Sequence, residues 1–153
     1  MDWMLMPLKR YAEFSGRSRR KEYWMYLLLI VIVGFVLGMI EGVMGLQQSV
    51  AGVYGPLSAI LALATFIPSL AVGVRRLHDT DRTGWWMLLP ILPYAAAFAM
   101  LFSGNVAMFG ILALVALGCA VVVLVFMVLD GTKGPNKYGP DPKGGVDADK
   151  VFA

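Results

Sequence analysis

Residues 23–40 read YWMYLLLIVIVGFVLGMI, a run without one charged side chain. Three further uncharged apolar runs follow, at residues 57–74, 85–102 and 106–129. A helix needs roughly 20 apolar residues to cross the hydrocarbon core of a bilayer. Polar and apolar residues do not alternate within the runs, which argues against barrel strands, and backbone amides in lipid must pair within their own segment. The sequence therefore predicts an all-α membrane protein with four transmembrane helices.

The composition agrees with this class. Of the 153 residues, 59% are hydrophobic and 15% are charged, whereas an average soluble domain is about 25% charged. The length suits one bundle, so we expect a single membrane domain over residues 1–153. It divides into an arm (1–21), the four-helix bundle (22–129) and a tail (130–153). The one cysteine, Cys119, excludes a disulfide framework.

The basic residues predict the orientation. All 13 Lys and Arg lie in three segments, at residues 9–21, 75–82 and 133–150, and the connections near residues 47–49 and 103–105 contain none. By the positive-inside rule, both termini are expected in the cytoplasm. The resulting basic face makes anionic lipid headgroups the expected partners. Nucleic acid is not an expected partner, because no nucleic-acid-binding fold is recognisable.

The arm before the first apolar run has amphipathic character. Pro7 suits a first helical turn, and Leu8, Tyr11 and Ala12 then share one face. This pattern predicts a short interfacial amphipathic helix, which Gly16 would end.

A second helix start is expected at Ser18, an N-cap residue. On that helix Arg17, Arg20 and Trp24 would share one face by three-and-four spacing. Two arginines on one face can clamp a phosphate or an acidic partner. They can also simply orient a membrane helix by reaching towards the headgroups, which is the interpretation we favour.

The polar chemistry of the chain gathers in GVRRLHDTDRTGWW, residues 73–86, and RRLHDTDRTG within it, residues 75–84, is expected to be a cytoplasmic turn. Arg75 and Arg76 join the arginines of the arm there, and Asp79 and Asp130 supply anions. Because a buried arginine without a partner is costly, we predict at least one Arg–Asp bridge between segments, from Asp79. This polar cap is either purely structural or a pocket for a lipid phosphate or a partner.

Structural roles are favoured for His78 and for the two tryptophans of this stretch. His78 beside Asp79 is a weak candidate for a general base or proton relay, and a structural, hydrogen-bonded histidine is favoured. Metal binding is not favoured, because no second histidine or accessible cysteine completes a ligand set, and no cofactor is predicted. Trp85 and Trp86 are expected to anchor the third helix at the interface, with Arg–Trp stacking as a further contact.

Glu41 is the one acid predicted on the side opposite the basic segments. It adjoins a ladder of Gly34, Gly38 and Gly42, a pattern that lets helices approach closely. Glu41 is either an ion or proton site or an interfacial acid that reaches periplasmic water, and the second is favoured. Three prolines are expected to kink the second and third helices: Pro68, Pro90 and Pro93.

The tail begins DGTKGPNKYGPDPKGG, in which glycine and proline recur too often for a helix or strand. We expect a loop against the cytoplasmic face or a flexible tail, with fraying after about Asp141.

Three blocks of this sequence resemble the signature blocks of a bacterial family known as Domain of Unknown Function 805. They are FSGRSRRKEYWMYLL, PSLAVGVRRLHDTDRTGWWMLLPILP and DGTKGPNKYGPDP, in the same order and over essentially the whole chain. The resemblance implies a small, multi-pass inner-membrane protein without an established activity or a known cofactor. The family often has glycine where Asp81 stands and serine where Thr83 stands. Its pattern carries over to Gly16, Arg17, Arg20, Tyr23, Trp24, Pro68, Arg75, Arg76, Leu77, His78, Asp79, Gly84, Trp85, Gly131, Asn136, Tyr138, Gly139 and Pro140.

Three classes of function remain open. The favoured class is a non-enzymatic membrane module that binds lipid or partner proteins, with a second copy of the chain as one candidate partner. The others are an oligomeric channel or small transporter, and a membrane enzyme that acts on a phosphorylated lipid through His78 and Asp79. The residues predicted to form a ligand, phosphate or partner site are Arg17, Arg20, Trp24, Arg75, Arg76, His78, Asp79, Arg82, Trp85, Asn136 and Tyr138.

Overall fold

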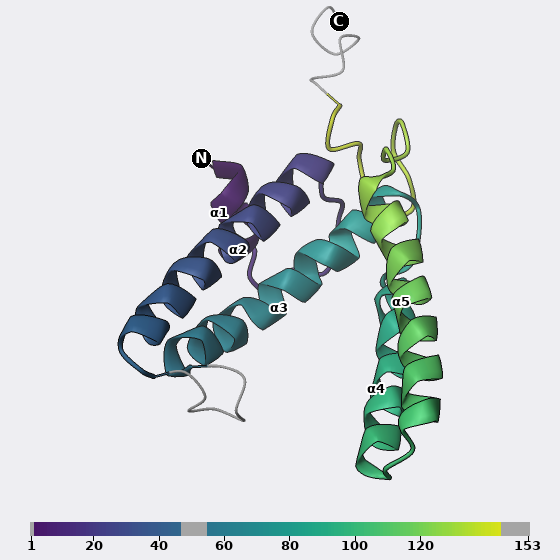
Figure 1. The fold of residues 1–153 in the computed structure, drawn as a ribbon. Coiled ribbons are helices and arrows are strands. Elements are labelled where there is room, and N and C mark those ends of the chain that lie inside the picture. The colour runs from purple at the N-terminus through teal and green to yellow at the C-terminus, as the bar shows by residue number, and fades with distance from the viewer. Residues whose placement is uncertain (1, 47–54, 145–153) are drawn as a thin grey trace, which may run out of the picture. The chain divides into compact units, whose positions relative to one another are not determined.

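The computed structural model describes residues 2–46 and 55–144. These residues form helices joined by short connections, followed by a loop after the last helix (Figure 1). Their one β-type pairing is an isolated bridge between Asn136 and Gly139. The elements are α1 (Asp2–Lys9), α2 (Arg20–Val43), α3 (Pro56–Asp79), the 3-10 turn η1 (Gly84–Met87), α4 (Leu88–Phe102) and α5 (Val106–Val128).

The four long helices predicted from the apolar runs are present, with η1 and α4 forming the third. Each is long and apolar enough to cross a membrane. The 24 residues of α2, for example, extend about 36 Å at 1.5 Å per residue, which exceeds a hydrocarbon core of about 30 Å.

The helices expose apolar side chains and bury polar ones. Phe35, Leu63 and Leu114 are more than half exposed. Several charged or hydroxyl side chains are buried instead: Arg17, Ser18, Glu22, Glu41, Arg75, Arg76, Asp79 and Thr80. This distribution suits a lipid environment, because hydrocarbon accepts apolar side chains and leaves polar groups to find partners within the protein.

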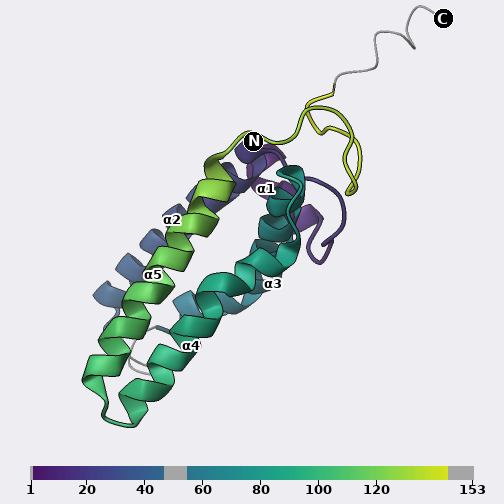
Figure 2. The same ribbon diagram turned by 90° about the vertical axis from the view of Figure 1, so that its right-hand side faces the viewer.

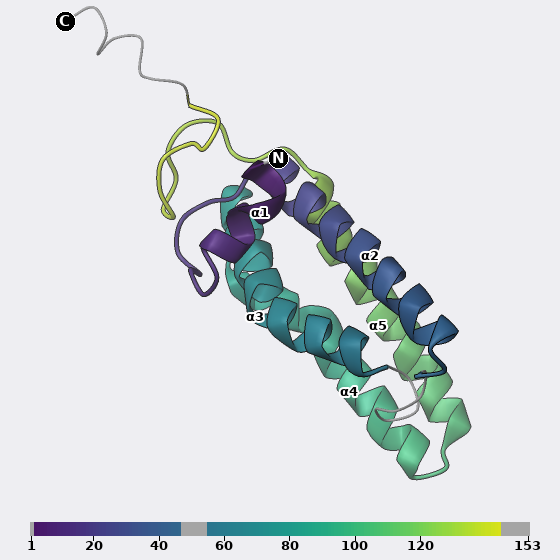
Figure 3. The same ribbon diagram turned by 90° about the vertical axis from the view of Figure 1, so that its left-hand side faces the viewer.

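The chain forms two compact units: residues 2–14 with 21–72, the first unit, and residues 15–20 with 73–144, the second unit. In the first unit, α2 and the first part of α3 run antiparallel (Figures 1 and 3). The Tyr26 hydroxyl donates to the Thr65 carbonyl at 3.5 Å. Further along α2, Glu41 contacts Ser58, so residue numbers rise along one helix as they fall along the other.

The glycine ladder of α2 is only partly used in this packing. A Cβ atom at Gly34 would lie 3.7 Å from the Leu61 side chain, in ordinary contact. A Cβ atom at Gly38 would meet nothing within 4 Å. Gly34 therefore faces α3, and Gly38 leaves an open position on the surface of α2.

α1 differs from the helix expected for the arm. It begins at Asp2 and has Pro7 in its interior, whereas the prediction began the helix at Pro7. Proline lacks an N–H and removes one helical hydrogen bond, and the helix ends at Lys9. Tyr11 therefore follows the helix instead of lying on its apolar face. The location of α1 at a membrane interface stays a prediction.

Tyr11 contacts α3 where Pro68 interrupts the hydrogen bonding of that helix. Since Pro68 has no N–H, the carbonyl of Ala64, four residues earlier, lacks its helical donor. The Tyr11 hydroxyl donates to this carbonyl at 2.8 Å. The arm thus supplies the donor that Pro68 removes, and a proline is accommodated inside a long helix.

In the second unit, α4 and α5 form an antiparallel hairpin (Figure 2). Residues 103–105 connect them, with Gly104 at φ 75°, and the Asn105 side chain accepts a hydrogen bond from Met108 N at 3.1 Å. Pro90 lies in the first turn of α4, directly after η1. The kinks expected at Pro68, Pro90 and Pro93 stay predictions.

Candidate functional site

The turn expected over residues 75–84 is shorter than predicted, because α3 continues through Asp79. Arg76 and Asp79 are three residues apart on this helix and form an ion pair, which supports its last turn. Thr80 N then donates to Leu77 O at 3.0 Å and ends the helix. Asp81 follows at φ 59°, the left-handed conformation that glycine favours and that aspartate tolerates.

Asp79 is the centre of a buried ionic cluster with Arg17 and Arg76, which we call the arginine–aspartate cluster. Arg17 Nη2 lies 3.0 Å from Asp79 Oδ1. Arg76 Nη1 pairs with Asp79 Oδ2. All three side chains are at most 2% exposed. The predicted bridge from Asp79 to an arginine of another segment is confirmed, and each carboxylate oxygen has a cationic partner.

Arg17 also holds the loop that follows α5. Its Nη1 donates to Gly134 O at 2.7 Å, and its Nη2 donates to Thr132 O at 2.6 Å. The same loop approaches Asp79 so closely at Gly131 that a Cβ atom there would overlap the carboxylate. Gly131 of the third sequence block is therefore required by the close approach of its backbone to Asp79.

Arg76 and Arg20 satisfy carbonyls at the end of α5. Arg76 Nε donates to Met127 O at 3.1 Å, and its Nη2 donates to Leu129 O. Arg20 Nη1 donates to Val128 O at 3.0 Å. The last carbonyls of a helix have no intrahelical donor, and cations near them are favourable. Arginines from two other segments thus cap α5.

His78 takes part in a second set of contacts with the loop. Its ring stacks on Tyr138, with centroids 3.8 Å apart and planes 3° apart. Its Nδ1 lies 3.2 Å from Gly16 O and, since a carbonyl only accepts, carries the proton. Asn136 Nδ2 donates to His78 O at 3.0 Å. The structure therefore favours the structural interpretation of His78 and brings it together with Asn136 and Tyr138, as the sequence predicted.

An exposed ion-pair group lies at the start of this loop. Asp130 Oδ1 is 2.5 Å from Arg20 Nη2 and 2.9 Å from Lys143 Nζ. The hydrogen bond from Lys143 and the charge of Arg20 hold the pKa of Asp130 below its ordinary value. Backbone N–H groups of Lys143 and Gly134 lower the pKa of Asp141 in the same direction.

The expected shared face of Arg17, Arg20 and Trp24 is wrong for Arg17. α2 begins at Arg20, so Arg17 precedes the helix, whereas Arg20 and Trp24 lie four residues apart on it. Ser18 does not cap it, because the Ser18 hydroxyl is buried and has no hydrogen-bond partner among the described residues. Trp24 packs edge-on against Tyr23 at 5.4 Å.

The remaining predicted residues of this region lie outside the arginine–aspartate cluster. Arg75 is fully buried, and its carbonyl accepts a hydrogen bond from Ser18 N at 3.1 Å. The guanidinium of Arg82 lies over the Phe126 ring at 3.9 Å, so an arginine of this segment stacks on a phenylalanine, whereas the sequence predicted a contact between arginine and tryptophan. Trp85 is 77% exposed, as an interfacial anchor would be.

Glu41 lies in the first unit and is 2% exposed, so the prediction that it reaches water is wrong. Its Oε1 accepts from Leu57 N at 2.5 Å and from Ser58 N at 2.9 Å. Its Oε2 accepts from Ser58 Oγ at 2.5 Å. We call these residues the Glu41 cluster. Glu41 satisfies the free N–H groups at the start of α3, where the helix dipole favours a negative charge.

Sequence reasoning missed the main-chain partners of these side chains. Thr132, Gly134, Met127 and Leu129 take part through carbonyl oxygens, which every residue type has, so nothing in the sequence marks them. Tyr11 did have a signal, because a proline inside an expected helix implies an unpaired carbonyl four residues earlier. The fraying expected beyond Asp141 falls mainly on residues 145–153, outside the described residues.

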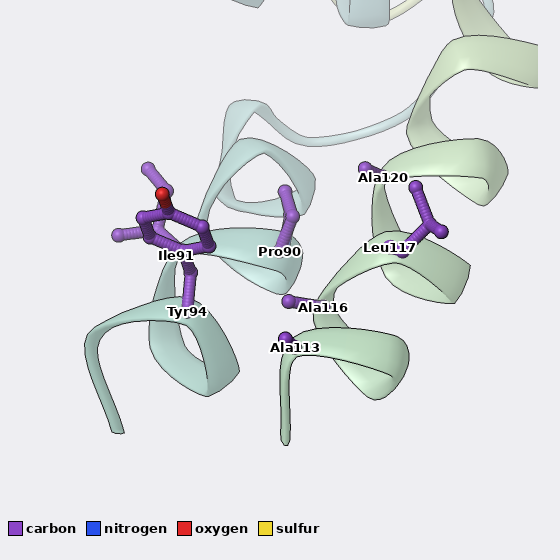
Figure 4. A pocket seen from close by; sticks show the side chains of 7 residues that line it. All are labelled: Pro90, Ile91, Tyr94, Ala113, Ala116, Leu117 and Ala120. Carbon is purple, nitrogen blue, oxygen red and sulfur yellow. The ribbon is translucent and has the colours of Figure 1, made fainter. Parts of the chain in front are cut away.

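A hollow of about 420 Å³ lies in the second unit between α4 and α5. Figure 4 shows Pro90, Ile91 and Tyr94 of α4 beside alanines and a leucine of α5. The lining is apolar apart from the Tyr94 hydroxyl. None of the predicted site residues lines this hollow, and it contains no group suited to catalysis.

Comparison with known proteins gives consistent matches. Residues 11–140 match the model of the family described as Protein of unknown function (DUF805). The chain is similar to two inner membrane proteins of Escherichia coli K12: YhaH, 41% identical over 94% of this chain and 98% of that protein, and YhaI, 41% identical over 95% and 98%. It is also similar to the uncharacterized protein YiiR of the same organism, 33% identical over 84% of each chain.

No solved structure matches the chain. The family match covers the arm after α1, the four long helices and most of the loop after α5. It includes every member of the arginine–aspartate cluster and of the Glu41 cluster. The chain belongs to the DUF805 family of bacterial inner-membrane proteins.

Proposed function

We propose that this protein is a non-enzymatic membrane module that binds anionic lipid headgroups at a basic cytoplasmic face. The observation that carries the proposal is the saturation of the arginine–aspartate cluster. Both oxygens of Asp79 accept hydrogen bonds from arginines. The remaining described donors of Arg17 and Arg76 donate to backbone carbonyls. These groups hold the fold together, and exposed cations are left to act on the surroundings.

The same saturation argues against an enzyme that uses His78 and Asp79. A general base needs a free acceptor within reach of the proton that it removes. Asp79 is 1% exposed, and His78 is stacked on Tyr138 with its Nδ1 at a carbonyl. Asp79 therefore presents no free lone pair to a substrate, and because its carboxylate pairs with Arg17 and Arg76, it does not act on the His78 ring as the orienting partner of a catalytic base would.

The channel or transporter alternative depends on Glu41 as an ion or proton site. Glu41 accepts three hydrogen bonds from the start of α3. A helix cap explains this carboxylate without a permeating ion. Proton or cation flux in vesicles that contain the protein, lost in Glu41→Gln, would reverse this preference.

The proposed orientation has both termini and residues 80–83 on the cytoplasmic side, because the basic segments lie there by the positive-inside rule. A cysteine introduced at Asp81, which is exposed, should react with a membrane-impermeant maleimide only after the cells are opened. Labelling of intact spheroplasts would overturn the orientation and the cytoplasmic location of the binding face.

Native mass spectrometry of the purified protein tests the proposal directly. The protein is taken from nanodiscs of equal phosphatidylglycerol and phosphatidylethanolamine, and the retained lipids are identified together with the number of subunits. We expect phosphatidylglycerol to be retained in excess, with the excess falling as salt screens the cations. Equal retention of the two lipids would contradict the proposal.

A further inference from the structure

Arg82 has no carboxylate partner among the described residues, unlike the arginines that form the ion pairs given above. Arg10 pairs with Glu13, Arg20 pairs with Asp130, and the two cluster arginines share Asp79. Among residues 2–46 and 55–144, no carboxylate pairs with Arg82. Its one hydrogen bond is a donation from Nη1 to Thr80 O at 3.2 Å. Arg82 therefore carries a positive charge that the described protein does not neutralise.

Two aromatic rings fix the position of this charge. The guanidinium carbon lies 3.9 Å from the centroid of the Phe126 ring. Trp86 packs edge-on against the same ring, with centroids 5.3 Å apart and planes at 89°. A cation over an aromatic face is stabilised there but keeps its full charge. The rings thus hold the guanidinium in place without neutralising its charge.

A hollow of about 380 Å³ begins at the next residue along the chain. Thr83, Trp85 and Trp86 supply hydroxyl and indole groups to it, and three leucines at the start of α4 supply apolar walls: Leu88, Leu89 and Leu92. Trp85 is 77% exposed. The hollow is mainly apolar, and Trp86, which lines it, packs against the Phe126 ring on which Arg82 lies. A cation thus stands beside an apolar hollow, as a headgroup stands beside an acyl chain in a phospholipid.

We propose that Arg82 and this hollow form a binding site for an anionic phospholipid of the phosphatidylglycerol type. This inference rests on the function proposed above and assigns it to one site. The planar guanidinium pairs with the phosphate, for which its paired donors are suited. One acyl chain lies against the leucines of α4. Phosphatidylethanolamine binds less well, because its own ammonium group neutralises its phosphate.

Arg82→Gln tests the site, with Lys137→Gln as the matched control. Both substitutions remove one positive charge from the second unit, and Lys137 is 56% exposed and paired with Asp81. Both proteins are recovered from nanodiscs of equal phosphatidylglycerol and phosphatidylethanolamine. We expect Arg82→Gln to lower the ratio of retained phosphatidylglycerol to phosphatidylethanolamine about tenfold, which corresponds to ~1.4 kcal/mol. Lys137→Gln should change it less than twofold.

A second pair of variants separates loss of the site from loss of the fold. Arg82→Lys keeps the charge and loses the planar fork, so retention should fall between that of the wild type and that of Arg82→Gln. Trp85→Ala opens the hollow without touching the charge and should also lower retention. Unchanged melting temperatures in detergent are expected for both, since neither residue belongs to the arginine–aspartate cluster.

The outcomes distinguish this inference from the proposed function. If the wild type retains phosphatidylglycerol in excess and Arg82→Gln does so equally, the site is elsewhere and this inference is wrong, while the proposed function stands. If the wild type retains both lipids equally, the proposed function fails. If the masses instead reveal a dimer that Arg82→Gln dissociates, a second copy of the chain occupies the hollow and the lipid assignment is overturned.

Discussion

Glu41 and Asp79 are both buried carboxylates, 2% and 1% exposed, yet they are stabilised in different ways. Glu41 accepts hydrogen bonds from neutral donors at the start of α3, which lie 16 or 17 residues away in the sequence. Asp79 pairs with two full cations, one of which is 62 residues away. The difference is that a helix start supplies a partial positive charge locally, whereas Asp79 stabilises arginines that themselves need an anion.

The two clusters also differ in how much of the chain depends on them. The Glu41 cluster joins the end of α2 to the start of α3. The arginine–aspartate cluster joins residues 15–20, the end of α3, the end of α5 and the loop that follows it. Removing one charge from the second cluster should therefore disturb more of the structure than removing one from the first.

Asp79→Asn is expected to have the largest effect. The NH₂ group of asparagine replaces an oxygen that now accepts a hydrogen bond from an arginine, so two donors face each other. Two buried guanidinium groups also lose their anion. Removing one partner of a buried ion pair destabilises a protein by about 3–5 kcal/mol. The free energy of unfolding in a detergent titration measures the loss. Asp130→Asn is the control, because the Asp130 side chain is 65% exposed and should matter much less.

Gly131→Ala should have the next largest effect. The added methyl group would overlap the Asp79 carboxylate, so the loop or the carboxylate must move. Overpacking of this kind costs about 1–3 kcal/mol. Gly134→Ala is an informative comparison, because a Cβ atom there meets nothing within 4 Å but the residue has φ 75°. A smaller loss for Gly131→Ala than for Gly134→Ala would mean that close packing on Asp79 is unimportant.

Glu41→Gln should lower the melting temperature less than Asp79→Asn does. Glutamine keeps one oxygen to accept from Leu57 N and Ser58 N, and its NH₂ group can donate to Ser58 Oγ, which then acts as the acceptor. What is lost is the charge at the start of α3. Thermal unfolding of the two variants in the same detergent makes the comparison. A larger effect at Glu41 would invert the ranking of the two clusters.

Titration of the exposed Asp130 should have the smallest effect. The folded protein lowers the pKa of Asp130, so its contribution is complete above the ordinary aspartate pKa of about 3.9 and disappears as pH falls through the lower folded value. Melting temperatures should thus be unaffected by this group between pH 7 and 5 and should fall below about pH 4. Asp130→Asn should weaken that fall. An Asp130-dependent change near neutral pH would contradict the lowered pKa.

Several features of this protein could be predicted because they depend on residue type and spacing alone. The four long helices follow from the uncharged runs, and pairing of Asp79 follows from the cost of a buried arginine. His78, Asn136 and Tyr138 were expected in one region, and they lie in contact. The start of α1, the cap at Ser18 and the extent of α3 through Asp79 differ from the prediction. Single residues such as Pro7 and Ser18 do not by themselves set where a helix begins, and the Arg76–Asp79 pair supports a last turn of α3 inside the expected turn over residues 75–84.

By itself, the sequence determined the membrane class, the number of spans and the concentration of arginines and aspartates in a few segments. The reason is that hydrocarbon selects for residue type along the chain. Only the tertiary structure decided that Glu41 caps α3, that Tyr11 serves the carbonyl freed by Pro68, and that Arg17 and Arg76 end on carbonyls of distant residues. Carbonyl oxygens are the same in every residue, so their pairing depends on where the chain places them in space.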